Sequence, residues 1–280
     1  MSGPQCSCGA GAELREKILA EAPRLGPGDV FRFACHPGVS CYNRCCADVN
    51  IFLSPYDVLR MRKRLGMDSG EFLRKYTLLP VHKEMKTPAV LLRMNDDAAK
   101  TCPFVCEKGC SIYADRPWPC RMFPLGLAAQ KDTPDGWQGE RFYFLLKEEV
   151  CQGFHEAREW TVAQWLEDQK VDEYDRWGEP YKELTLHPFF EGGGVLPPEK
   201  LHMLYTACYD LDAFRRFVFE STLLERFEVD ADFVEQMRYD DEELLRFAFL
   251  WLRFSLFGER TMMLKDGAIK AIKGKRAQGG

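Results

Sequence analysis

Cysteine is the residue that most restricts what this chain can fold into. It occurs twelve times in 280 residues, and nine of the twelve fall between Cys35 and Cys151. A chain of this length can bury enough apolar surface to fold without disulfide bonds. In a reducing compartment, many cysteines more often indicate metal ligands or redox chemistry than disulfides. Metal binding is therefore the first hypothesis.

Other features of the sequence indicate in which compartment the protein occurs and which partners it does not have. The N-terminal residues lack a basic stretch followed by an apolar run, so we expect no secretory signal. The nearest candidate for a membrane span, 247–257, is short and contains Arg253, so we expect no membrane and a cytoplasmic protein. The formal net charge of -5 gives no broad basic field, so nucleic acid is not an expected partner.

The order of the patterns predicts an α+β fold. We expect an irregular, loop-rich metal-binding core with short strands, followed by a mostly α-helical C-terminal part. The expected domains are an N-terminal helix and tail over 1–27, a cysteine-cluster domain over 28–178, and a helical region with a basic tail over 195–280. The Gly- and Pro-rich segment 191–199 suits a linker or an ordered loop between the last two.

Local signals predict the positions of the helices. Ser54 followed by Pro55 and Asp57 predicts an N-cap and a helix through residue 65. Ser69 is predicted to cap a helix that extends through residue 76. Thr161 and Gln164 resemble a capping box and predict a helix that extends through about residue 174. Further helices are expected over 12–22, 198–208, 210–222, 230–237 and 241–257. The segments 89–94 and 142–146 are predicted to be strands that pair with each other.

Two cysteine clusters carry the expected chemistry. Glycine and proline between the cysteines let the backbone turn so that several sulfurs face one centre. Thiolates are soft ligands that suit zinc, copper(I) and iron–sulfur clusters rather than calcium or magnesium. The bacterial ferredoxin spacing, the regular zinc ribbon and the radical S-adenosylmethionine spacing do not occur. The clusters are CHPGVSCYNRCC, with Cys35, Cys41, Cys45 and Cys46, and CPFVCEKGCSIYADRPWPC, with Cys102, Cys106, Cys110 and Cys120.

The adjacent pair Cys45 and Cys46 carries separate information. Neighbouring side chains diverge in most backbone conformations, so two adjacent thiolates seldom bind one tetrahedral ion together. Either they reach two different metals, or one binds the metal while the other lies outside its coordination shell. A polynuclear centre or two sites therefore suits this sequence better than one isolated zinc. We also predict that Cys41, Cys45, Cys102 and Cys120 converge on one ion or cluster.

The second cluster also carries a resemblance to a known family. Its elements are Cys102–Pro103–Phe104, Cys110–Ser111–Ile112–Tyr113, Arg116–Pro117 and Cys120–Arg121–Met122–Phe123–Pro124, followed later by Cys151–Gln152–Gly153. Together they resemble the YkgJ-type cysteine-cluster proteins, over about 30–178. The resemblance implies iron–sulfur or zinc binding. It extends to the cysteine-rich part of flagellin lysine methylases.

These observations give a ligand set and three hypotheses for the function. We prefer an iron–sulfur cluster used in electron transfer or as a structural centre, with a protein or redox partner. The alternatives are a zinc scaffold without catalysis and a metal-containing enzyme distantly like the methylases. Cys106 could be a ligand or a buried thiol, His36 and His155 flank ligand candidates, and Cys208 is expected to pack in the core. The predicted ligands are Cys35, Cys41, Cys45, Cys46, Cys102, Cys110, Cys120 and Cys151.

Overall fold

The structure, a computed structural model, describes residues 22–80, 86–129, 141–147 and 149–270. The helix predicted over 12–22 and the end of the basic tail lie outside these residues, as do Cys6 and Cys8. About half (50%) of the described residues are helical, with short strands mostly in the N-terminal half and helices in the C-terminal half. The predicted α+β class is confirmed. None of the described helices is both long and apolar enough to cross a membrane.

The chain forms two compact units that alternate along the sequence. Unit 1 comprises Met1–Cys45 and Pro119–Asp172, and unit 2 comprises Cys46–Trp118 and Glu173–Gly280. Both units contain parts of the predicted 28–178 domain. The domain boundaries drawn from the sequence stay a prediction.

Unit 1 is built from two antiparallel strand pairs and a short helix. Strand β1 (Val30–Arg32) pairs with β9 (Glu159–Thr161), and β7 (Leu125–Ala129) pairs with β8 (Arg141–Leu145). Helix α5 (Val162–Asp168) follows β9 and brings Trp165 against Phe31, Phe33 and Trp160, with ring centroids 5.2–6.0 Å apart. The indole N–H groups of Trp160 and Trp165 donate to backbone carbonyls, so these buried rings leave no polar atom unsatisfied.

Strand pairing in unit 2 corrects one prediction. Strand β4 (Val90–Leu92) lies between β2 (Phe52–Leu53) and β3 (Thr77–Leu78) in a three-stranded antiparallel sheet. The segments 89–94 and 142–146 both contain strands, as predicted. Their pairing with each other was wrong, because β8 pairs with β7 across a hairpin. Local hairpin and sheet partners were available to both strands, and the sequence pattern shows only that a strand exists.

Capping residues fix the ends of several helices. Ser54 and Asp57 form the predicted capping box of α2 (Pro55–Leu65), which ends at Gly66 in the left-handed conformation. Thr161 and its Gln164 partner cap α5 in the same way, but the helix stops at Asp168 instead of continuing to 174. Lys170, at φ 54°, separates it from α6 (Val171–Thr185). The predicted cap of α3 (Ser69–Tyr76) was wrong, since Asp68 caps it.

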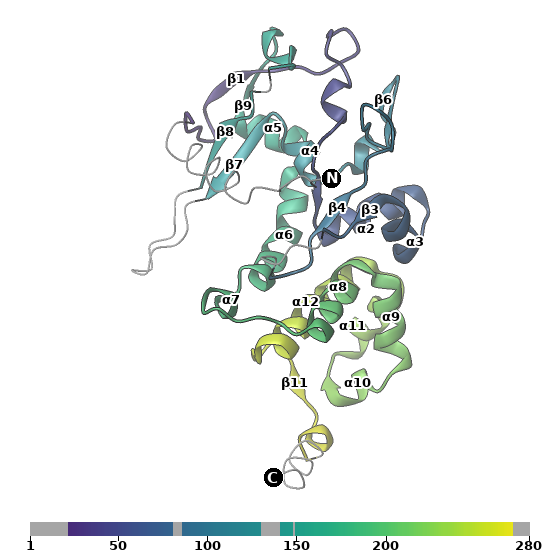
Figure 1. Ribbon diagram of the computed structural model, residues 1–280. Coiled ribbons are helices and arrows are strands. Elements are labelled where there is room, and N and C mark those ends of the chain that lie inside the picture. Colours follow the sequence, from purple (N-terminus) through teal and green to yellow (C-terminus); the bar gives the residue numbers. More distant parts are fainter. Residues whose placement is uncertain (1–21, 81–85, 130–140, 148, 271–280) are drawn as a thin grey trace, which may run out of the picture. The chain divides into compact units, whose positions relative to one another are not determined.

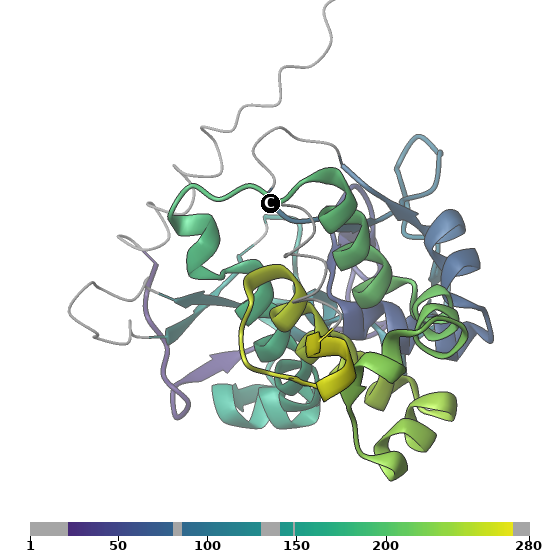
Figure 2. The same cartoon turned by 90° about the horizontal axis from the view of Figure 1, so that it is seen from below.

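The C-terminal helices of unit 2 form its core, as their apolar periodicity predicts (Figure 1). Seen from below (Figure 2), the green and yellow helices form one group. Cys208 is fully buried in this core, which confirms its predicted packing role. The helices are α7 (Pro188–Glu191), α8 (Pro198–Tyr209), α9 (Leu211–Glu220), α10 (Leu223–Arg226), α11 (Ala231–Tyr239) and α12 (Asp241–Phe257), and β10 (Phe227–Glu228) pairs with β11 (Met263–Leu264).

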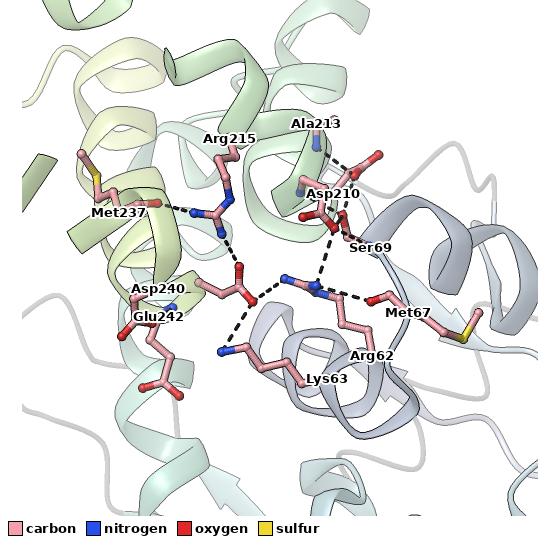
Figure 3. A network of polar contacts seen from close by, with 12 residues as sticks. Arg62, Lys63, Met67, Ser69, Asp210, Ala213, Arg215, Met237, Asp240 and Glu242 are labelled. Atoms are coloured by element: carbon pink, nitrogen blue, oxygen red, sulfur yellow. Dashed lines mark hydrogen bonds and ion pairs between the residues drawn. The ribbon is translucent and has the colours of Figure 1, made fainter. Parts of the chain in front are cut away.

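A polar network links α2 to these helices inside unit 2 (Figure 3). Asp241, at the start of α12, receives the guanidinium groups of Arg62 and Arg215, and its Oδ2 lies 2.5 Å from Arg62 Nη2. The side chains of Arg62 and Asp241 are only 8% and 10% exposed. Lys63 reaches the same carboxylate at 3.5 Å from a side chain that is 45% exposed. A buried charge that lost such partners would be strongly unfavourable.

Replacing Asp241 by asparagine should therefore destabilise unit 2 by about 3 kcal/mol or more, because two arginines lose a buried countercharge. Lys63→Gln removes a third ion pair to the same carboxylate from a solvated position, and should cost less than about 1 kcal/mol. Urea unfolding followed by circular dichroism measures both. If both substitutions lowered the free energy of unfolding by the same amount, burial of the Arg62–Asp241 pair would not be what makes it stabilising.

Candidate metal centre

Three cysteines of unit 1 follow β1 in a run of tight turns. Cys35 is exposed, Cys41 is buried, and Cys45 lies in the 3₁₀ turn η1 (Arg44–Cys46). Turns rather than strands or helices therefore place these three thiols. The turns are closed by backbone hydrogen bonds of 2.9–3.0 Å, donated by Val39 to His36, by Tyr42 to Val39 and by Arg44 to Cys41.

A fourth cysteine reaches the same region from a distant segment. The N–H of Ala34 donates to the carbonyl of Gly153 at 3.1 Å, and the N–H of Gln152 points at Cys41 Sγ at 3.1 Å. A Cβ at Gly153 would lie 2.6 Å from the Ala34 carbonyl oxygen and 2.8 Å from the Phe33 ring, so only glycine fits without movement. This close approach brings Cys151 beside the first cluster.

Four thiols of unit 1, those of Cys35, Cys41, Cys45 and Cys151, act on each other electrostatically. Cys35 is exposed by its surface area, yet the surrounding atoms are dense enough to desolvate its thiol in part. That desolvation, followed by the charges of Cys45, Cys41 and Cys151, raises the pKa of Cys35 to about 11. Burial, with Cys41 and Cys45 nearby, also raises the pKa of Cys151. The raised pKa values favour the protonated thiols of Cys35 and Cys151, and a bound metal would supply the charge that lets them ionise.

Unit 2 holds a second group of thiols on a short hairpin. Strands β5 (Val105–Cys106) and β6 (Gly109–Cys110) pair, and Gly109 begins β6 at φ 105°, a conformation that favours glycine. Cys102 precedes the hairpin, and its N–H donates to the Cys46 carbonyl at 2.8 Å. Burial raises the pKa values of both Cys102 and Cys110, which lie close enough that Cys110 raises the pKa of Cys102 further.

Backbone N–H groups are directed at three of these sulfurs. Phe104 and Val105 donate toward Cys102, Ile112 toward Cys110, and Gly153 toward Cys151, and each interaction favours the thiolate. In all three cases a donor lies two residues after the cysteine. Hydrogen bonds of this kind stabilise metal-bound thiolates and tune the metal. The sequence analysis did not anticipate them, because a backbone donor leaves no signature in side-chain type.

The other predicted ligands occupy positions on both units. Cys46 follows Cys45 in η1 but belongs to unit 2, whereas Cys45 belongs to the thiol group of unit 1. The boundary between the two units falls between these adjacent cysteines, and the expectation that they do not bind one ion together stays a prediction. Cys120 is exposed on α4 (Trp118–Met122). The predicted convergence of Cys41, Cys45, Cys102 and Cys120 joins residues of both units, and it stays a prediction.

Cys106 is exposed, so it is not the buried thiol considered above; its thiol donates to the Gly109 carbonyl at 3.1 Å.

His36 Nδ1 accepts from the Gly38 N–H at 3.2 Å, and its Nε2 faces Glu156 at 3.3 Å. Both nitrogens of His36 therefore have protein partners. His155 ends a 3₁₀ turn, η3 (Gly153–His155), that does not include Cys151.

The donor chemistry of both groups fits a soft metal. Sulfur atoms predominate, and the N–H groups directed at them favour the charged form that a metal binds. Among the residues that the structure describes, no three histidine, cysteine or acidic side chains converge as a ready ion site.

Comparison with known proteins agrees with this class of site. Residues 34–152 match the CxxCxxCC family, described as "Putative zinc- or iron-chelating domain". The match spans every predicted ligand from Cys35 to Cys151. Over these residues the chain is similar to a zinc- or iron-chelating domain, which supports metal binding by the cysteines. Searches of curated proteins and of solved structures found no match.

Because Gly153 brings Cys151 to the first cluster, Gly153→Ala should lower the metal content of the purified protein. The added methyl group forces the 151–153 segment away from Ala34 and Phe33. Gly28→Ala is the matched control, since a Cβ there meets nothing within 4 Å and it lies in the same unit. Elemental analysis of zinc and iron per chain measures the effect. Equal metal content in both variants would contradict a ligand role for Cys151.

Proposed function

We propose that this domain holds an iron–sulfur cluster that serves in electron transfer with a protein partner, or as a structural centre. The observation that carries the proposal is the set of N–H groups directed at the sulfurs of Cys102, Cys110 and Cys151. Hydrogen bonds to sulfur are one of the means by which proteins set the reduction potential of such clusters. The abundance of thiols, in two separate groups, also suits a polynuclear centre better than a single ion.

Within this proposal the residues of the chain have distinct roles. Cys35, Cys41, Cys45 and Cys151 would supply thiolates from unit 1, and Cys102 and Cys110 from unit 2. The buried guanidinium of Arg116 lies near enough to Cys110 to favour its thiolate, and would offset part of the negative charge there. The cluster would supply one-electron chemistry when bound. The residues around it hold the sulfurs, donate hydrogen bonds and limit solvent access.

A zinc scaffold is the second candidate, and one observation favours it. Four thiols gather in unit 1, which is the number of ligands in a structural tetrahedral zinc site. Such a site would stabilise the turns between Cys35 and Cys45 without any redox role. Zinc and iron–sulfur centres differ in colour and in response to reductant, so the two candidates are separable.

If the centre is an iron–sulfur cluster, protein purified without oxygen should be brown, with broad visible absorption that dithionite bleaches. Elemental analysis should find iron and acid-labile sulfide in similar amounts. Colourless protein with stoichiometric zinc and no iron would instead support the scaffold. The same preparation exposed to air serves as the control, because oxygen should destroy the absorption of a cluster but leave bound zinc in place.

The ligand roles should be separable by substitution. Cys110→Ser and Cys151→Ser should each lower metal affinity more than tenfold, since a ligand contributes at least as much as its outer partners. Cys208→Ala is the control, because this cysteine is fully buried in the apolar core of unit 2 and is not among the predicted ligands. Metal content after dialysis against a chelator of graded strength measures the affinity. Retention of metal by both serine variants would exclude these cysteines as ligands.

A further inference from the structure

A pocket in unit 2 has features that the metal site does not use. It measures about 420 Å³ and is lined by one face of α6 and one face of α12. The lining positions on α6 include 173, 176, 177 and 180, and those on α12 include 242, 246, 249, 250 and 253. Both sets follow the three- and four-residue spacing of a single helix face. The volume lies within the range of small-molecule sites.

The middle of the pocket is apolar and aromatic. Trp177 and Pro180 of α6 and Phe249 and Leu250 of α12 line it. The Trp177 ring stacks on Tyr56, with centroids 5.3 Å apart and the planes 13° from parallel, which fixes its orientation. A flat or branched apolar group would contact these side chains without displacing polar atoms.

Most charges around the pocket are already paired. Glu173 pairs with Arg60, Glu183 pairs with Arg253, and Arg246 pairs with Glu243 at 3.3 Å. These pairs leave two lining residues that form no ion pair within the described part of the chain, the anion Glu242 and the cation Arg176. The two lie on different helices, so one charge of each sign is available to a ligand.

The surroundings of Glu242 favour a cationic group. The Tyr56 hydroxyl lies 2.8 Å from Glu173 and 3.3 Å from Glu242, and it has one proton to donate. Burial raises the pKa of Tyr56, so the hydroxyl keeps that proton, and the shorter contact assigns it to Glu173. Glu242 is then a half-buried carboxylate without a strong donor. A charged N–H donor on a ligand would therefore form a favourable hydrogen bond with this carboxylate.

Arg176 supplies the complementary charge. Its guanidinium forms no ion pair within the described part of the chain, and the residue lines the same pocket as Glu242. A carboxylate would bind this guanidinium by charged hydrogen bonds.

We infer that this pocket binds a small zwitterion of the amino-acid type, with its amine at Glu242, its carboxylate at Arg176 and an apolar side chain over Trp177 and Phe249. The proposal concerns unit 2 alone and does not depend on which metal the cysteines hold. Its failure and that of the iron–sulfur proposal are therefore distinguishable.

Titration calorimetry of the full chain with three compounds tests the inference. Free L-phenylalanine carries both charges, phenethylamine lacks the carboxylate, and phenylacetate lacks the amine. L-phenylalanine should bind about tenfold to a hundredfold more tightly than either, since each charged hydrogen bond contributes to that extent. Equal affinity for the three compounds, or no binding of L-phenylalanine, would overturn the proposal.

Two substitutions assign the charges to their residues. Glu242→Gln should abolish the preference for L-phenylalanine over phenylacetate, and Arg176→Gln should abolish the preference over phenethylamine. Glu179→Gln and Lys182→Gln are the controls, because both residues lie on α6 outside the pocket lining. Circular dichroism verifies that each variant is folded. Unchanged preferences in Glu242→Gln and Arg176→Gln would also refute the assignment.

Discussion

Repulsion between neighbouring thiolates is the constraint on which the cysteine-rich part of this protein depends. Several sulfurs that ionise at close range need a cation between them, and burial makes that need greater. Four thiols of unit 1 show the effect, because desolvation and the charges of Cys45, Cys41 and Cys151 raise the pKa of Cys35. A metal ion would replace the repulsion between the sulfurs by attraction to the ion. Because the site forms only when the turns that carry the cysteines are folded, the free energy of metal binding would also stabilise those turns.

The two thiol groups differ in how far the fold prepares them. Cys102 and Cys110 pack against the helical core of unit 2, and a paired hairpin with a left-handed glycine holds their spacing. The unit 1 thiols lie on turns that depend on backbone hydrogen bonds and on the close approach of Gly153. The helices of unit 2 have their own apolar core and a buried ion network around Asp241. We therefore expect these helices to stay folded without metal.

Local signals in the sequence predicted much of the fold. The capping boxes at Ser54 and Thr161 were found because they are side-chain patterns within four residues, and the helix at 241–257 because its apolar face is dense. The pairing of β4 with β2 and β3 was missed, since partners distant in sequence leave no local trace. Cys208 was recognised as core from its helical setting. The N–H donors to Cys102 and Cys110 could not be predicted, because every residue except proline has the same backbone N–H.

X-ray absorption at the iron and zinc edges of the purified protein tests the central claim, that cysteine sulfur holds the metal. The account predicts a first shell made of sulfur alone, at about 2.3 Å, with the iron edge giving the signal. Sulfur scattering at the zinc edge alone would keep the thiolate site and replace the cluster by zinc. A first shell dominated by nitrogen or oxygen would contradict the account.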